Sequence, residues 1–265
     1  MKKLLFVLLV GTILACGQDK NEDTTPPRKP VFVYKSLDSA KVETGIDAIP
    51  ETDGIRFEWF LNTENDLDVY TIYRRKDSVN TTFSELTSIE ADSKDFLDSL
   101  LVTQGEDSGL IRQYLFFVDD SINIAQSFDY YIRAFDKSGN PSSPSDTVSY
   151  RIEPKPTILE PKKQTNSQTP SLKWNWNPLS FPQFLVRVRD EFGKTIWIYQ
   201  NIPDAFPEDY EVVFNEDGKA SIPLLEQDGK YSWRIDGIGS YNEPFSGAES
   251  AWEEFIVDTT QTVSQ

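Results

Sequence analysis

The chain has no histidine, one cysteine and one methionine among its 265 residues. Without histidine it lacks the commonest general base, the Ser-His-Asp and Cys-His catalytic sets and the usual imidazole metal ligands. One cysteine allows neither an intramolecular disulfide nor a thiolate metal cluster, so we expect the hydrophobic core alone to stabilise the fold. Basic residues are also scarce. The 26 Lys and Arg against 43 Asp and Glu give a formal net charge of −17, which excludes nucleic acid from the expected partners.

The first sixteen residues have the pattern of a secretory leader. Two lysines precede an apolar stretch at residues 4–14, which is too short to span a membrane as a helix. The only cysteine ends the run Ile13-Leu14-Ala15-Cys16, and this run resembles the lipobox of bacterial lipoproteins. The resemblance implies that residues 1–15 are a signal peptide and that the thiol of Cys16 carries a diacylglyceryl group. Membrane lipid is then a partner through Cys16, because two or three acyl chains anchor durably where one does not.

Residues 16–30 are predicted to be the lipidated cysteine and a flexible, acidic and proline-containing tether. The segment 17–30 has no aliphatic or aromatic side chain, so it cannot bury enough surface to fold alone. Its acidic residues Asp19, Glu22 and Asp23 are similar to the export signals that send lipoproteins to the cell surface in the Bacteroidetes group. The expected location is the outer membrane with the body exposed at the cell surface, and the alternative is the same membrane with the body facing the periplasm.

From residue 31 on, the sequence predicts an all-β chain. Short runs of alternating apolar and polar residues are separated by Pro, Gly, Asn and Asp, and hardly any helical periodicity is present. Prolines at 154, 156 and 161 divide the chain into two parts, 31–153 and 154–259, each the size of one β-sandwich. A polar tail follows at 260–265.

Three runs of the first part carry a family resemblance. Trp59 stands near the end of one alternating run, Tyr70-Thr-Ile72 lies in the next, and Tyr130-Tyr-Ile-Arg-Ala-Phe-Asp136-Lys-Ser-Gly-Asn140 follows later. Together they resemble the fibronectin type III domain, an immunoglobulin-like β-sandwich. The resemblance implies that Trp59 is the core tryptophan of strand B, that Tyr70 and Ile72 face inward from strand C, and that Tyr130 is the tyrosine-corner residue of strand F.

Strand E of that family has two candidates here, Phe96-Leu-Asp98 and Phe117-Val-Asp119. The spacing to Tyr130 favours the second and makes residues 88–112 an insertion. Within the insertion we predict a short helix that is capped in the segment 92–95 and ended by Gly105. Its apolar face would be formed by Phe96, Leu97, Leu100 and Leu101.

The second part repeats the pattern of the first. An alternating run at 170–176 is followed by a predicted hairpin at 184–199, and Gly229-Lys-Tyr-Ser-Trp233-Arg-Ile235 precedes Trp252-Glu-Glu-Phe-Ile-Val257. These last two runs again resemble strands F and G of a fibronectin type III domain. The predicted fold class is therefore two tandem immunoglobulin-like, fibronectin type III β-sandwiches after a lipoprotein signal peptide.

The aromatic residues of the second part divide into predicted core and candidate ligand contacts. Trp174, Trp176 and Trp233 share strand faces with apolar residues, so we assign them to the core. Trp197 and Tyr199 lie on the hairpin, which we expect at a sheet edge. They are the candidate ligand-contact residues, because flat rings can stack on a sugar face.

No catalytic residue, metal site or cofactor is predicted. The pairs Asp119 with Asp120 and Asp66 with Asp68 could serve acid–base chemistry, but 43 acidic residues make such pairs unavoidable. Oxygen-rich turns at 136–140 and 215–218 lack the spacing of an EF-hand calcium loop, and Asp and Asn are common in turns for backbone reasons.

We interpret the protein as a non-enzymatic, lipid-anchored protein of the cell envelope whose sandwiches act as spacer and interaction modules. The partner stays open between a protein and a glycan. The alternative function is a glycan-binding accessory lipoprotein of a polysaccharide uptake system, and a glycoside hydrolase that uses carboxylates alone comes third. The sequence predicts no oligomeric state.

Overall fold

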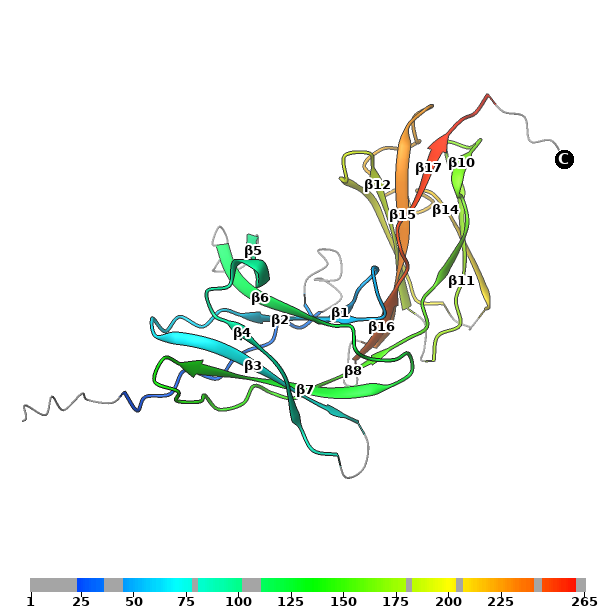
Figure 1. The fold of residues 1–265 in the computed structure, drawn as a ribbon. Coiled ribbons are helices and arrows are strands. Elements are labelled where there is room, and N and C mark those ends of the chain that lie inside the picture. Colours follow the sequence, from blue (N-terminus) through cyan, green and yellow to red (C-terminus); the bar gives the residue numbers. More distant parts are fainter. Residues whose placement is uncertain are drawn as a thin grey trace, which may run out of the picture.

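The computed structural model in Figure 1 describes most of the chain as two β-sandwiches. The described residues are 23–35, 45–77, 81–101, 111–179, 183–203, 207–240 and 245–260. Cys16 and the predicted signal peptide lie outside them. The described part contains no α-helix, and it holds no helix with the length and apolar character needed to cross a membrane.

The first sandwich consists of two sheets with the strand orders β1-β2-β6-β5 and β8-β7-β3-β4. Its strands are β1 (Asp47–Ala48), β2 (Ile55–Phe60), β3 (Leu67–Lys76), β4 (Ser84–Glu90), β5 (Leu97–Leu101), β6 (Ile111–Asp119), β7 (Ser127–Asp136) and β8 (Val148–Ile152). The inward side chains follow the alternation of the sequence, since side chains of a strand point to opposite faces in turn. Trp59, Tyr70, Ile72 and Tyr130 are all buried, as predicted.

The predicted helix in the insertion is wrong. A single 3-10 turn, η2 (Lys94–Phe96), leads directly into strand β5, which pairs antiparallel with β6 from Leu97 opposite Leu115 to Leu101 opposite Ile111. Pairing with β6 satisfies the backbone groups of this segment, and its apolar residues favour a strand as readily as a short helix. Strand β6, which contains Phe117 to Asp119, pairs with β2 in the position expected of strand E. The predicted helix end at Gly105 lies outside the described residues.

The second sandwich has one sheet of order β14-β11-β9 and a larger sheet in which β15 pairs with β12, β16 and β17. Its strands are β9 (Thr157–Glu160), β10 (Lys163–Thr165), β11 (Ser171–Asn175), β12 (Gln183–Asp190), β13 (Thr195–Asn201), β14 (Asp209–Val213), β15 (Lys230–Ser240), β16 (Phe245–Glu249) and β17 (Glu253–Val257). Its core is aromatic, with the ring of Trp174 stacked on Tyr210 at 5.3 Å and edge-on to Trp233 at 6.5 Å. Trp174, Trp176 and Trp233 are buried, as predicted.

The strand pairing of the first sandwich is immunoglobulin-like. The strands that the sequence assigned to positions B, E, C and F are β2, β6, β3 and β7, and β8 follows them in the position of strand G. β2 pairs with β6 in one sheet, and β3, β7 and β8 lie side by side in the other. This is the arrangement of strands A, B, E and D against C, F and G.

A shared sheet joins the two sandwiches. β8 of the first pairs in parallel with β16 of the second, with Tyr150 opposite Phe245 and Ile152 opposite Gly247. The N–H of Glu153 continues the ladder to the carbonyl of Gly247 at 2.8 Å. In Figure 1 the second sandwich rises from the end of the first at this pair of strands. One ten-stranded sheet therefore runs through both halves of the molecule.

Buried ion pairs surround this junction. Lys35 and Asp47, both of the first sandwich, form an ion pair. Lys35 forms a second ion pair with Asp236 of the second sandwich, with 3.0 Å between its Nζ and the carboxylate oxygen. Asp236 is fully buried and also lies 3.6 Å from Arg187. Burial alone would raise the pKa of Asp236, but the charges of Lys35, Arg187 and Arg234 outweigh it and lower that pKa below its ordinary value.

The end of the predicted tether lies against the first sandwich. Within residues 23–30, the N–H of Arg28 donates to Glu64 at 2.8 Å and the side chain of Asn62 donates to the carbonyl of Arg28 at 2.9 Å. The side chain of Asn140 donates to the carbonyl of Asp23 at 2.7 Å. These side chains satisfy backbone groups that an extended, proline-containing segment cannot pair within itself.

Candidate functional site

The candidate site is a groove on the second sandwich beneath the turn that joins β12 to β13. Asp190 shapes this turn, because its carboxylate accepts the N–H groups of Phe192 at 3.0 Å and Lys194 at 2.9 Å. Gly193 has a φ of +79°, a conformation that other residues adopt only with strain. The turn holds the ring of Phe192 in solvent, where 87% of the residue is exposed.

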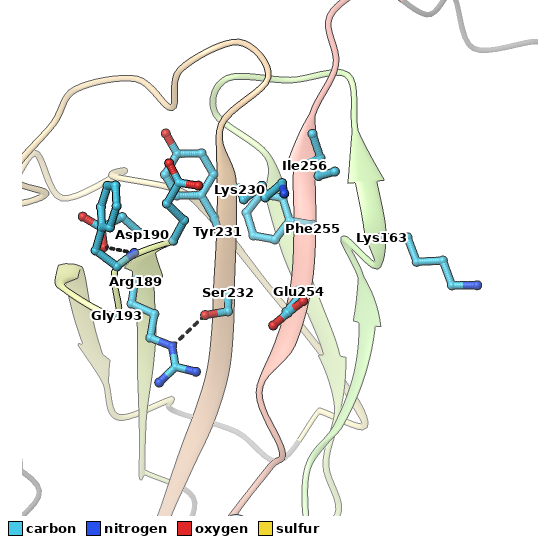
Figure 2. A pocket seen from close by; sticks show the side chains of 12 residues that line it. Lys163, Arg189, Asp190, Gly193, Lys230, Tyr231, Ser232, Glu254, Phe255 and Ile256 are labelled. Atoms are coloured by element: carbon cyan, nitrogen blue, oxygen red, sulfur yellow. Dashed lines mark hydrogen bonds between the residues drawn. The ribbon is translucent and has the colours of Figure 1, made fainter.

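The groove encloses about 670 Å³ between the turn and the strands β15, β17 and β10. Figure 2 shows Tyr231 and Phe255 behind it, with Ser232 and Glu254 lower on the same two strands. Tyr231 and Phe255 are buried, whereas Lys230 and Glu254 are exposed. The lining thus combines apolar and charged groups, which is typical of a surface that binds another molecule.

Arg189 supplies a positioned cation at this groove. Its Nε donates to the hydroxyl of Ser232 at 2.7 Å, and its guanidinium lies 3.8 Å from the centre of the Trp252 ring. Arg234 lies over the same ring at 4.9 Å. Stacking and the Ser232 bond hold the guanidinium without neutralising it. Among the described residues, no carboxylate forms an ion pair with Arg189 or Lys230.

The structure does not place the predicted ligand contacts in the groove. Trp197 is only 2% exposed, its Nε1 donates to Asp217 at 2.8 Å, and its ring packs edge-on against Phe214. A ligand therefore cannot stack on this ring without unfolding the core around it. Tyr199 is half-buried, and burial, together with Glu216 and Asp217, raises the pKa of its hydroxyl to about 12.

The structure separates Asp119 from Asp120, one of the carboxylate pairs considered in the sequence. Asp119 points into the first sandwich and accepts hydrogen bonds from Tyr130 at 2.9 Å and Arg74 at 2.7 Å, while Asp120 is exposed. Asp66 lies near Asp136 and Asp23, with one carboxylate oxygen of each within 4.8 Å of the others.

The carboxylate of Asp136 is already occupied. It accepts the N–H of Ser138 at 2.9 Å and both the N–H and the side-chain amide of Asn140 at 2.8 Å. This turn therefore has a structural explanation that needs no bound ion.

The groove was not found from the sequence. The run Asp190-Glu-Phe192-Gly193 predicts a hairpin turn, and a phenylalanine inside such a turn is the one local signal of an exposed apolar residue. Arg189, Ser232 and Trp252 are far apart in the chain, so their contacts follow only from the pairing of β12, β15 and β17.

Comparisons with known proteins identify no family for this chain. No family model matches the chain, and no curated protein matches it. Among solved structures, it is similar to the crystal structure of the FN1–FN3 domains of chicken CNTN1, with 12% identity, a TM-score of 0.33, and coverage of 89% of this chain and 69% of that one. The fold assignment rests on the strands themselves: the chain is an all-β protein built of two tandem β-sandwiches.

Proposed function

We propose that this protein is a non-enzymatic, lipid-anchored protein of the bacterial cell envelope that acts as a rigid spacer and presents the groove of its second sandwich to a protein partner. The main observation behind the spacer role is the strand pairing of β8 with β16, which makes one sheet continuous across the junction. Two domains joined by a flexible linker would instead move independently by default.

The side chains around the junction support the same role. Lys155, which follows the last strand of the first sandwich, donates to the carbonyls of Ile49 at 3.1 Å and Pro50 at 2.9 Å. Trp176 of the second sandwich donates through Nε1 to the carbonyl of Pro154 at 2.7 Å. Hydrogen bonds thus reach the connecting segment from both sandwiches, and this segment cannot serve as a hinge while they remain formed.

Spin-label distance measurements test the rigidity. The chain from residue 19 on keeps every described residue and contains no cysteine, so Asp77→Cys with Lys194→Cys places one label on each sandwich at exposed positions. We expect a single narrow distribution of distances. A broad distribution, comparable to that of labels on a flexible linker, would contradict the spacer role.

The membrane anchor rests on the lipobox resemblance and is tested separately. Cys16→Ser removes the thiol that would carry the lipid, so the chain should leave the membrane fraction or accumulate as the uncut precursor. Normal leader cleavage together with unchanged membrane fractionation would refute the anchor. Protease treatment of intact cells then distinguishes the proposed cell-surface location from a periplasmic one.

A glycan partner is the second candidate, and the exposed ring of Phe192 beside the unpaired cations Arg189 and Lys230 favours it. A ring that stacks on a sugar and cations that bind carboxylates would together suit an acidic polysaccharide. In affinity gels, Phe192→Ala should abolish retardation by such a polysaccharide, whereas Leu224→Ala, at another exposed apolar residue of the same sandwich, should not. No retardation of the unmodified protein by any polysaccharide would end this candidate.

A further inference from the structure

We propose that the groove of the second sandwich binds a segment of the partner protein that carries one acidic side chain flanked by apolar residues, and that Arg189 selects this segment by pairing with its carboxylate. The inference rests on the proposed function, because it names the chemistry of the partner that the groove would receive. In the described part of the chain, Arg189 donates one hydrogen bond, to Ser232, and forms no ion pair.

The guanidinium of Arg189 is fixed in position while its two terminal nitrogens keep their hydrogen-bonding capacity. Its Nε donates to the hydroxyl of Ser232 at 2.7 Å, and its Cζ lies 3.8 Å from the centre of the Trp252 ring. Figure 2 shows the terminal nitrogens pointing away from Ser232, and solvent reaches both of them. Two parallel N–H donors in one plane match the two oxygens of a carboxylate, and an arginine that is already fixed loses less entropy on binding.

Lys230 adds a second cation on the same face of the sheet. Lys230 and Ser232 are two residues apart on β15, so their side chains point to the same side, and Arg189 lies opposite Ser232 on β12. Lys230 is exposed and forms no ion pair among the described residues. Two unpaired cations therefore line one groove of a chain whose formal net charge is −17, and they make this groove a favourable place for a carboxylate.

The carboxylates of the groove restrict the ligand to few negative charges. Asp190, Glu191 and Glu254 line the groove together with the cations. The carboxylate of Asp190 is bonded to the backbone of its own turn, and Glu254 lies opposite Ser232 on β17, so that β15 separates it from Arg189. A polyanion laid across the groove would meet Glu191 and Glu254 and the repulsion of the acidic chain. A single carboxylate at Arg189 avoids both.

Apolar groups beside the cations favour a protein segment over a polysaccharide. Phe192 is 87% exposed and Ile256 is 38% exposed, and both line the groove. The other two rings of the lining, Tyr231 and Phe255, are buried and offer no open face on which a sugar could stack. An apolar side chain next to the acidic one would cover Phe192 and Ile256 on binding, and arginine beside aromatic surface is typical of the residues that dominate protein interfaces.

Titrations followed by NMR test the proposal on the chain from residue 19 on. The probes are a blocked peptide with one glutamate between leucines, the same peptide with glutamine in its place, and oligogalacturonate as an acidic polysaccharide. We expect the glutamate peptide to shift the amides of Phe192 and Gly193 and the Nε–H of Arg189, and to bind about tenfold more tightly than the glutamine peptide. Added salt should weaken this binding, because it screens the charge pair.

Three variants assign the binding to the groove. Arg189→Lys keeps the charge but loses the planar fork, so the affinity for the glutamate peptide should fall about tenfold. Arg28→Lys is the matched control, since this side chain is 84% exposed beside the first sandwich, and it should leave the affinity unchanged. Phe192→Ala removes a ring that lies in solvent and leaves the core intact, and it should weaken binding about threefold or more.

No shift with the glutamate peptide, equal affinity for the two peptides, or an unchanged affinity in Arg189→Lys would each overturn the proposal. Tighter binding of oligogalacturonate than of the glutamate peptide would also overturn it and would assign the groove to an acidic polysaccharide. The spin-label distances and the membrane fractionation do not depend on these titrations, so the choice of ligand can fail while the spacer and the anchor hold.

Discussion

Asp119 is the residue on which the polar contacts of the first sandwich converge. Its carboxylate is buried and accepts hydrogen bonds from Arg74 at 2.7 Å, from the hydroxyl of Ser121 at 2.7 Å and from the hydroxyl of Tyr130 at 2.9 Å. Burial and the charge of Asp119 both raise the pKa of Tyr130 well above its ordinary value, so its hydroxyl remains a donor throughout the working pH range. The hydrogen bond from Tyr130 to Asp119 therefore connects β7 to the end of β6.

Tyr130→Phe should therefore destabilise the first sandwich by about 1–3 kcal/mol, the usual cost of removing one partner of a buried charged hydrogen bond. Tyr131→Phe is the matched control, since this neighbour is half-exposed and stacks on Tyr73 at 4.7 Å through its ring. The control should cost less than about 0.5 kcal/mol. Calorimetric unfolding measures both, and equal effects of the two variants would show that the Asp119 bond does not contribute.

At the scale of elements, strand G of the second sandwich is divided in two. β16 and β17 both pair with β15, and Ser250 lies between them. The hydroxyl of Ser250 accepts the N–H of Ile235 at 3.0 Å, in place of a carbonyl of a regular ladder. The division lets the last part of the chain contact both sandwiches within one sheet: β17 pairs with β10 and β15 of the second sandwich, and β16 pairs with β8 of the first.

Close packing at β16 requires a glycine on β15. A Cβ added to Gly237 would lie 2.5 Å from a ring carbon of Trp176 and 3.1 Å from the carbonyl of Ala248. Gly237→Ala should therefore cost about 1–3 kcal/mol through overpacking. The cost should shrink in a Trp176→Phe background, where the smaller ring relieves the clash. Urea unfolding of the four chains of this cycle measures the coupling, and the same cost in both backgrounds would rule out the ring contact as the cause.

At the scale of the whole molecule, Lys35 links the sandwiches through buried carboxylates. Lys35→Met should cost about 3–5 kcal/mol, because it leaves the fully buried Asp236 and the half-buried Asp47 with one cation fewer. Lys29→Met is the control, because the ion pair of Lys29 with Asp146 is exposed and contributes about 1 kcal/mol or less.

The same ion pairs predict the response to acid. The pKa of Asp236 is lower in the folded protein than its ordinary value of about 3.9, so its ionised form stabilises the fold above that pH. This stability is lost as pH falls through the lowered pKa. Removal of Lys35 raises that pKa, and we expect Lys35→Met to unfold at a higher pH than the unmodified chain in a tryptophan-fluorescence titration. An unchanged midpoint would show that Asp236 does not govern acid unfolding.

The sequence by itself determined the all-β class, the two sandwiches and the buried aromatic core. Alternation of apolar and polar residues is a local property, and Trp59, Tyr130, Trp174 and Trp233 lie where that alternation predicts. The choice between Phe117 to Asp119 and Phe96 to Asp98 as strand E could also be made from spacing alone, since β6 pairs with β2.

Only the tertiary structure decided the rest, because those features depend on pairing between distant segments. Lys35 and Asp236 are 201 residues apart, and no pattern within either segment indicates that they meet. Strand β5 forms because β6 lies beside it, where the local sequence suits a helix equally well. Trp197 is in the core because Asp217 and Phe214 cover it, although its strand lies at a sheet edge. Pairing partners, which local periodicity does not specify, thus place the groove and the junction.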